Sequence, residues 1–127
     1  MNIPENLKYT KDHEWVKIDG DIATVGVTDF AQSELGDIVY LEVEKLDEDV
    51  EVNDTFGSVE AVKTVSDLFS PISGKIVEMN EELESSPEKI NEDPYGSGWI
   101  VKLAIEEGAD TSSLFDADGY QKHIGKA

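Results

Sequence analysis

Short stretches of alternating apolar and polar residues, separated by turn-forming residues, dominate this 127-residue chain. Residues 14–18 and 21–27 flank an Asp19-Gly20 pair, and an Asp-Gly pair between alternating segments is a strong β-hairpin signal. Further β-type segments are found at residues 37–43, 50–52, 55–62, 64–69, 74–78 and 99–103. Residues 91–98, rich in Asn, Asp, Pro and Gly, are expected to form a loop. Many short strands with frequent turn signals predict an all-β sandwich or barrel.

Helical signals are few and short. We predict helices at residues 28–35, at residues 80–86 and, as one or two short pieces, within residues 111–124. Thr28 or Asp29 can cap the first helix and Gly36 can end it, whereas Pro87 stops the second. Residues 110–112, Asp-Thr-Ser, are a cap signal for the third. Short peripheral helices and a C-terminal helical tail are therefore expected around a mainly β core.

Composition restricts the possible partners and chemistry. A chain of 127 residues with 39% hydrophobic residues fits a single domain, residues 1–127, with a modest core. The 29 acidic and 10 basic residues give a formal net charge of −19, which argues against binding to nucleic acid or to anionic membranes. This charge serves solubility, steering toward basic faces of partner proteins, or both. There are no cysteines, so disulfides and thiol nucleophiles are excluded, and redox work needs a bound cofactor or a partner.

The sequence shows no pattern typical of an enzyme. His13 and His123 are the only histidines, and they lie near opposite ends of the chain, unlike a histidine metal site or a Ser-His-Asp arrangement. An enzyme with an unrecognised acidic active site is the alternative, but no motif combines a positioned base with a metal set. No apolar segment approaches the ~20 residues of a membrane span, and the N-terminus lacks the features of a signal or transit peptide. We expect a bacterial-type cytoplasm, or an organelle matrix after processing.

Lys63 stands alone between two β-type segments. It is the only basic residue between Lys45 and Lys75, and residues 70–74, Ser-Pro-Ile-Ser-Gly, form a turn signal shortly after it. The pattern predicts a hairpin that displays the lysine amine at its tip. Spacing alone favours a solvated lysine in a turn or an edge-strand gatekeeper. An exposed tip also suits an acyl acceptor, because a ligase can surround it.

The segment around Lys63, residues 56–69, closely resembles the lipoyl-lysine hairpin of the glycine cleavage system H-protein family. Other segments that resemble the family, in the same order along the chain, are residues 8–16, 25–39 and 91–99. The resemblance thus covers roughly residues 8–103. Departures are small: residues 44–49 are more acidic than is usual in the family, and Ala61 stands where the family often has Ser. Biotin-carrying domains share the hairpin, but their acceptor lysines resemble Met-Lys-Met, whereas Val62 and Thr64 flank Lys63.

The resemblance implies a fold and a function. The implied fold is a barrel-sandwich hybrid of two antiparallel sheets, as in lipoyl and biotinyl domains, and we expect a monomer. The implied function is that of a non-catalytic carrier with lipoate in amide linkage to Lys63, attached by a lipoate ligase or a lipoyl/octanoyl transferase. The carrier takes the aminomethyl group of glycine from the P protein (glycine decarboxylase) to the T protein (aminomethyltransferase). It then delivers the dithiol to the L protein (dihydrolipoyl dehydrogenase). An H-like protein that relays lipoyl or octanoyl groups to other lipoate-dependent enzymes is the alternative, with the same fold and lysine.

The resemblance also implies a surface cleft that holds the loaded arm. The matching candidates are Glu14, Ser66 and Asp67, of which the two carboxylates would pair with the cationic amine of the cargo. Each of them, considered singly, is equally well explained as a solvated polar residue, and replacing either carboxylate should have little effect on stability. We expect His13 to pack or hydrogen-bond locally, and both tryptophans to belong to the core.

Overall fold

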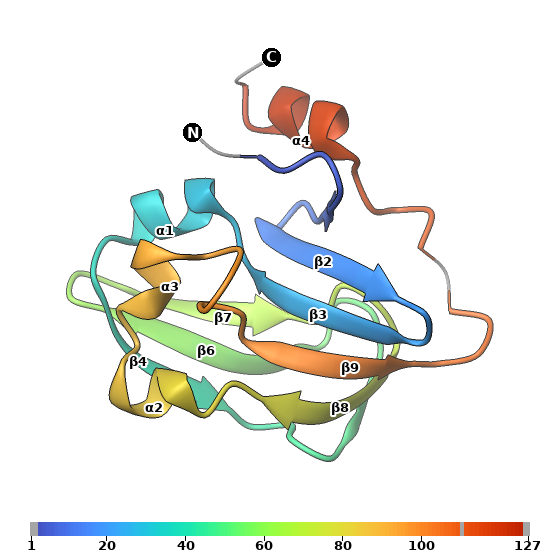
Figure 1. Ribbon diagram of the computed structural model, residues 1–127, viewed down its shortest axis with the longest axis horizontal. Helices are drawn as coiled ribbons and strands as arrows, with labels where there is room; N and C mark the ends of the chain where they lie inside the picture. Colours follow the sequence, from blue (N-terminus) through green and yellow to red (C-terminus); the bar gives the residue numbers. More distant parts are fainter. Residues whose placement is uncertain (1–2, 110, 126–127) are drawn as a thin grey trace.

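The computed structural model describes residues 3–109 and 111–125, which form two antiparallel sheets (Figure 1). The larger sheet has the strand order β1-β2-β3-β9-β8-β5. Its strands are β1 (Lys8–Tyr9), β2 (Glu14–Asp19), β3 (Ile22–Val27), β9 (Val101–Ile105), β8 (Gly74–Met79) and β5 (Asp49–Val50). The smaller sheet, in the order β4-β6-β7, contains β4 (Ile38–Val43), β6 (Thr55–Ala61) and β7 (Val65–Phe69). The prediction of a mainly β fold with two antiparallel sheets is confirmed.

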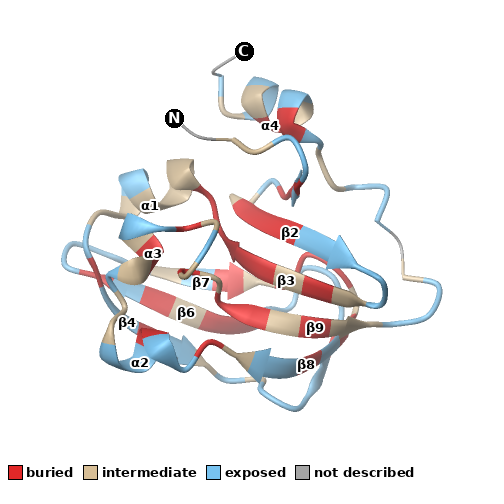
Figure 2. Ribbon diagram, viewed as in Figure 1, coloured by how far each residue is buried: buried red, intermediate tan, exposed pale blue. Residues whose placement is uncertain are grey.

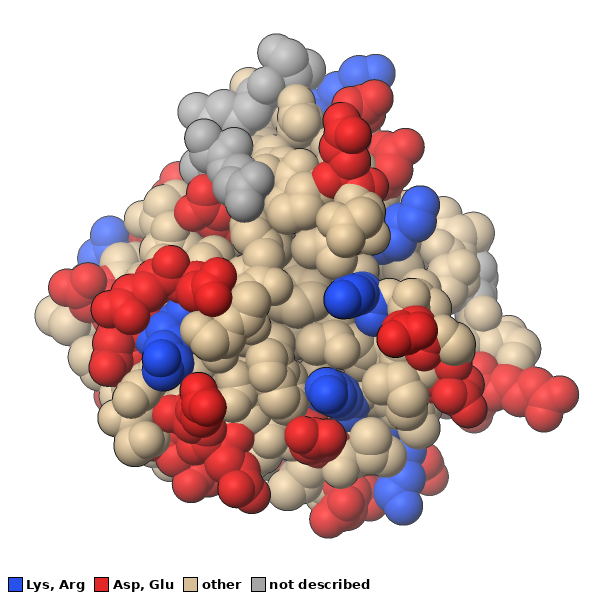
Figure 3. Space-filling model, viewed as in Figure 1, with Lys and Arg blue, Asp and Glu red and all other residues tan. Residues whose placement is uncertain are grey.

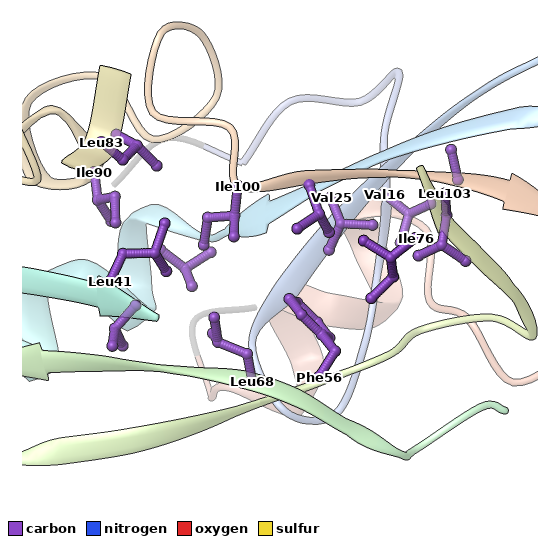
Figure 4. Close-up of a cluster of buried hydrophobic side chains, with 14 of the residues drawn as sticks. Val16, Val25, Leu41, Phe56, Leu68, Ile76, Leu83, Ile90, Ile100 and Leu103 are labelled. Carbon is purple, nitrogen blue, oxygen red and sulfur yellow. The ribbon is translucent and has the colours of Figure 1, made fainter. Parts of the chain in front are cut away.

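The main core lies between the two sheets (Figure 4). The larger sheet contributes Val16, Val25, Ile76 and Leu103, and the smaller sheet contributes Leu41, Phe56 and Leu68. All seven side chains are at most 3% exposed. Burial of apolar surface is the main favourable term in folding, so this layer fixes how the two sheets lie against each other.

The helices are short and lie outside the sheets, as predicted. They are α1 (Asp29–Leu35), α2 (Glu82–Ser85), α3 (Lys89–Glu92) and α4 (Ala117–His123). Thr28 caps α1, because its side chain accepts a hydrogen bond from the Ala31 N–H at 3.1 Å, and Gly36 ends the helix with a φ of 81°. Two predictions were wrong in detail. The C-terminal helix is capped by Asp116 rather than by residues 111–112 (residue 110 lies outside the described part), and α3 was not expected at all.

A second, smaller core joins the two ends of the described chain. Tyr9 and Tyr120 are fully buried and their rings stack, with centroids 4.8 Å apart. Trp15 belongs to this cluster and is 2% exposed, as predicted, whereas Trp99 is only partly buried and packs at the cluster's edge. The cluster fixes α4 against the N-terminal segment, and Figure 2 shows the buried inner positions of both elements beside exposed outer ones.

Acidic side chains surround this fold. Figure 3 shows groups of Asp and Glu along the edges of the face in view, with a few lysines between them. Lys45 and Glu48 form a salt bridge, with their Nζ and Oε1 atoms 3.9 Å apart. Within the described part of the chain, no helix is both long and apolar enough to cross a membrane.

Candidate functional site

Lys63 lies between β6 and β7, at the tip of their hairpin, and is exposed. The two strands of this hairpin are labelled in Figure 1. The turn is closed by the Ala61 N–H, which donates to the Thr64 carbonyl at 2.7 Å. A second hydrogen bond ties the tip to the rest of the protein, because the Val62 N–H donates to the Asp37 carbonyl at 3.0 Å. The hairpin is therefore anchored through its backbone while the lysine amine is left accessible.

The aliphatic part of the Lys63 side chain lies over Gly36, at the end of α1. A Cβ placed on Gly36 would come within 3.3 Å of the Lys63 Cε. The positive φ of Gly36, 81°, is one that residues with a Cβ rarely adopt. Glycine at this position thus ends the helix and leaves room for the lysine stem.

The side chain of Asn91, in α3, holds residues 36–38, the segment to which the hairpin tip is hydrogen-bonded. Its side-chain oxygen accepts from the Ile38 N–H at 2.9 Å, and its amide nitrogen donates to the Gly36 carbonyl at 2.8 Å. These bonds fix residues 36–38, which include the carbonyl that receives the Val62 N–H. Sequence reasoning missed this role, because nothing local to residues 91–98 links them to the hairpin.

A cleft of about 340 Å³ lies beside the hairpin, between β7, α1 and the start of β2. Its apolar wall is formed by Val27, Phe30, Ala31, Leu35, Val59 and Leu68. All three predicted cleft candidates, Glu14, Ser66 and Asp67, also line it. The structure thus brings together residues that are more than 50 positions apart in the sequence. Lys63 itself does not line the cleft, but it lies next to Gly36, which follows the lining residue Leu35.

Glu14 is the most unusual member of the cleft, because it is a carboxylic acid only 2% exposed. One carboxyl oxygen accepts from the Phe69 N–H at 2.7 Å, and the other is 3.4 Å from the Thr10 hydroxyl. Burial raises the pKa of Glu14 to about 8, although both hydrogen bonds oppose this shift. Glu14 is therefore mainly uncharged at neutral pH. The expectation of a weak effect on stability treated both carboxylates as solvated, which holds for the exposed Asp67 but not for the buried Glu14.

His13 connects the cleft to the C-terminal helix. Its Nδ1 lies 2.9 Å from the Tyr120 hydroxyl, which is in turn 2.7 Å from the hydroxyl of Thr28, the cap of α1. His13 does pack, as expected, with its ring centroid 4.9 Å from the Phe30 ring centroid, but its side-chain hydrogen bond to Tyr120 is long-range rather than local. The His123 ring also lies beside His13, with centroids 5.7 Å apart, and burial followed by the His123 charge lowers the pKa of His13. Helix α4 thereby braces the helix that forms one wall of the cleft.

Comparison with known proteins explains this combination of hairpin and cleft. A family model described as "Glycine cleavage H-protein" matches residues 7–127. The crystal structure of a glycine cleavage system H protein from Mycobacterium marinum superposes with a TM-score of 0.84 and 39% sequence identity. That match covers 97% of this chain and 99% of the other. The chain belongs to the glycine cleavage H-protein family. H proteins are non-catalytic lipoyl carriers that work with the enzymes of the glycine cleavage system.

The residues present fit the lipoyl group that H proteins carry. The group consists of an alkyl chain ending in a sulfur-containing ring, and the six apolar residues of the cleft offer a matching surface. Glu14, Ser66 and Asp67 add polar groups to the lining of the same cleft, although both carboxyl oxygens of Glu14 already have hydrogen-bond partners. The side chain of Lys63 lies beside Gly36, which directly follows Leu35 of this wall.

Proposed function

We propose that this chain is the lipoyl carrier of a glycine cleavage system, with lipoate in amide linkage to Nζ of Lys63. The observation that carries the proposal is an exposed lysine at the tip of an anchored hairpin, in a chain of the H-protein family. When attached, the group supplies the redox-active sulfur pair that a chain without cysteine lacks. The protein itself catalyses no reaction in this proposal.

The carrier takes the aminomethyl group of glycine from the P protein to the T protein, and it presents the dithiol to the L protein. A tether makes each delivery to a docked partner effectively intramolecular, with effective concentrations on the order of mM for short flexible links. The hydrogen bond from the Val62 N–H to the Asp37 carbonyl anchors the hairpin, so the tether starts from a fixed position. The cytoplasmic location and the monomeric state expected from the sequence stay predictions.

The cleft residues hold a cationic amine and keep water away from it. Glu14 is mainly neutral when the cleft contains no cation, because burial raises its pKa to about 8. A cation within ~4–6 Å lowers the pKa of a carboxyl group, so Glu14 gives up its proton and becomes the counter-ion as the amine enters. Asp67, which is exposed, adds a second carboxyl group at the cleft, and the Ser66 hydroxyl adds a hydrogen-bonding group.

Reconstitution tests the proposal. The lipoylated chain, mixed with purified P, T and L proteins, tetrahydrofolate and NAD+, should support continued release of CO2 from glycine, and the chain alone should not. Lys63→Arg should abolish this support while keeping the melting temperature of the parent protein. Turnover by the chain alone would contradict the carrier role. Lipoyl transfer to other lipoate-dependent enzymes, with no turnover in the P, T and L mixture, would establish the relay alternative instead.

A further inference from the structure

Exposed apolar side chains gather beside the lysine at the hairpin tip. Among the described residues, eight large hydrophobic side chains are exposed, and four of these belong to the tip or to strands that flank it. They are Val39, Tyr40, Val62 and Val65, which are 47%, 54%, 75% and 61% exposed. We call these four residues the hairpin patch. Single exposed hydrophobic residues are normal, whereas a contiguous group marks an interaction site.

Strand register shows why the patch faces solvent. Tyr40 pairs with Glu60, and Glu60 pairs with Val65, so these three side chains form one row on one face of the small sheet. The neighbouring pair, Ile38 and Ala61, is buried, which places the row on the outer face.

A β-bulge enlarges this outer face. The register shifts between Ile38 and Tyr40, so both Val39 and Tyr40 are exposed. In a regular strand that starts with a buried Ile38, Val39 would face solvent and Tyr40 would face the core. Bulges commonly redirect a side chain in this way next to a functional site. The bulge in β4 therefore exposes a tyrosine that a regular strand would bury, and β4 pairs with β6 of the hairpin.

The charges around the patch indicate what it binds. Strands β4, β6 and β7 contain three carboxylates, Glu42, Glu60 and Asp67, and no Lys or Arg, and Asp37 precedes β4. All four carboxylates are exposed. Glu60 lies between Tyr40 and Val65 in the exposed row, so a complementary partner surface offers apolar contacts together with lysine or arginine opposite Glu60 and the other carboxylates.

The length of the lysine side chain decides between possible partners. An enzyme that acylates Lys63 must bring its own active site to Nζ, which is separated from the backbone by only four methylene groups. The residues that flank the lysine must therefore contact that enzyme, whereas partners served by the loaded arm are reached over a longer tether. We propose that the hairpin patch is the docking surface for the enzyme that acylates Lys63, through an active-site mouth that combines apolar surface with basic residues. This inference rests on the proposed function, in which Lys63 carries lipoate.

The patch and the cleft lie on different sides of β7. Ser66 pairs with the buried Val59 and lines the cleft, while its neighbour Val65 belongs to the outer row. Side chains alternate between the two faces of a strand, so Val65 and Ser66 serve different surfaces, although Asp67, which alternation places on the side of Val65, also borders the cleft. An enzyme on the patch can therefore reach Lys63 without entering the cleft.

Acylation kinetics test this assignment. The double variant Tyr40→Ser/Val65→Thr removes apolar surface and keeps a β-branched residue in β7, and Val77→Thr is a matched control at an exposed position of β8. With a lipoate ligase, lipoate and ATP, kcat/KM for acylation measured by intact mass should fall about tenfold in the double variant, which corresponds to about 1.4 kcal/mol. It should stay within about twofold in the control.

A competition assay separates docking from chemistry. Lys63→Arg cannot be acylated at this position but keeps the patch, so it should inhibit acylation of the parent protein. Lys63→Arg combined with Tyr40→Ser/Val65→Thr should inhibit about tenfold more weakly at a temperature where both competitors are folded. Equal inhibition by the two competitors, or equal kcat/KM in the parent and the double variant, would overturn the inference. A parent protein that the ligase does not acylate at Lys63 would overturn the proposed function itself.

Discussion

The tip of the lysine hairpin and the cleft beside it are built in opposite ways. The tip is held by backbone hydrogen bonds and exposes its side chains, with Val62 75% and Val65 61% exposed. The cleft is held by side chains, and its key acid, Glu14, is 2% exposed. An acceptor that an enzyme must surround is expected to be open, whereas a group that binds a cation away from water is expected to be enclosed. In the proposed function, attachment and protection are therefore separate tasks, carried out by neighbouring parts of one fold.

The largest expected effect concerns the enclosed acid of the cleft. The pKa of Glu14 is raised from 4.5 to about 8 in the folded protein, so between these pH values the unfolded chain releases a proton that the native state keeps. The free energy of unfolding therefore falls as the pH rises through this window, and it falls no further from this cause above pH ~8. Glu14→Gln cannot ionise and keeps an acceptor for the Phe69 N–H.

Urea unfolding from pH 4 to pH 9 measures this effect. Glu14→Gln should gain stability relative to the parent protein as the pH rises, reaching a few kcal/mol at pH 9. Asp67→Asn, at an exposed position of the same cleft, is the control and should follow the parent protein closely. A constant difference between Glu14→Gln and the parent at every pH would show that Glu14 is ionised in the native state.

The next effect concerns the support of the tip. Asn91→Ala removes the acceptor of the buried Ile38 N–H and the donor to the Gly36 carbonyl, which should cost about 2 kcal/mol. It should also speed hydrogen exchange of the Val62 amide, because the Asp37 carbonyl loses its fixed position. Asn91→Asp keeps the acceptor and should lose less stability. Unchanged exchange at Val62 in Asn91→Ala would mean that the tip is rigid without this support.

A smaller effect is expected at the brace between α4 and the cleft wall. Tyr120→Phe removes the hydroxyl that lies between His13 and Thr28, which should cost about 1 kcal/mol in thermal or urea unfolding. Tyr40→Phe, which removes a hydroxyl from a side chain that is 54% exposed, should change stability little. Equal effects of the two substitutions would show that the buried network contributes nothing specific.

The smallest effect is expected at the exposed side of the cleft. Asp67→Asn removes one charge from a solvated position, where an ion pair contributes about 0.2–1 kcal/mol. Release of ammonia from the aminomethyl-loaded carrier without the T protein should therefore be faster by at most about fivefold. An acceleration much beyond this in Asp67→Asn would place the main counter-ion at Asp67 rather than at Glu14.

The parts of the molecule that follow local patterns were predictable from the sequence. Alternation and turn residues predicted the β2–β3 and β6–β7 hairpins, and Thr28 and Gly36 predicted the bounds of α1. Each of these signals depends on residues that are close in the sequence and on the preferences of the backbone. The position of Lys63 at an exposed tip follows from the same local signals.

The parts that depend on packing between the sheets were not predictable from residues alone. The family resemblance proposed Glu14 and Asp67 as members of one cleft, but not the burial of Glu14, which arises where the start of β2 packs against the end of β7. The contact of His13 with Tyr120 joins residues 107 positions apart. Helix α3 is a single turn stabilised by burial of Ile90, and such tertiary effects override weak local propensity.

The central claim is that covalent attachment is confined to the hairpin tip, while the cleft takes part only through non-covalent contacts. Intact-mass measurement after exposure to a lipoate ligase tests it most directly. The parent protein should gain the mass of one lipoyl amide, and Lys63→Arg, with the same fold by circular dichroism, should gain none. A lipoyl adduct that persists in Lys63→Arg, or a second adduct in the parent protein, would contradict the claim.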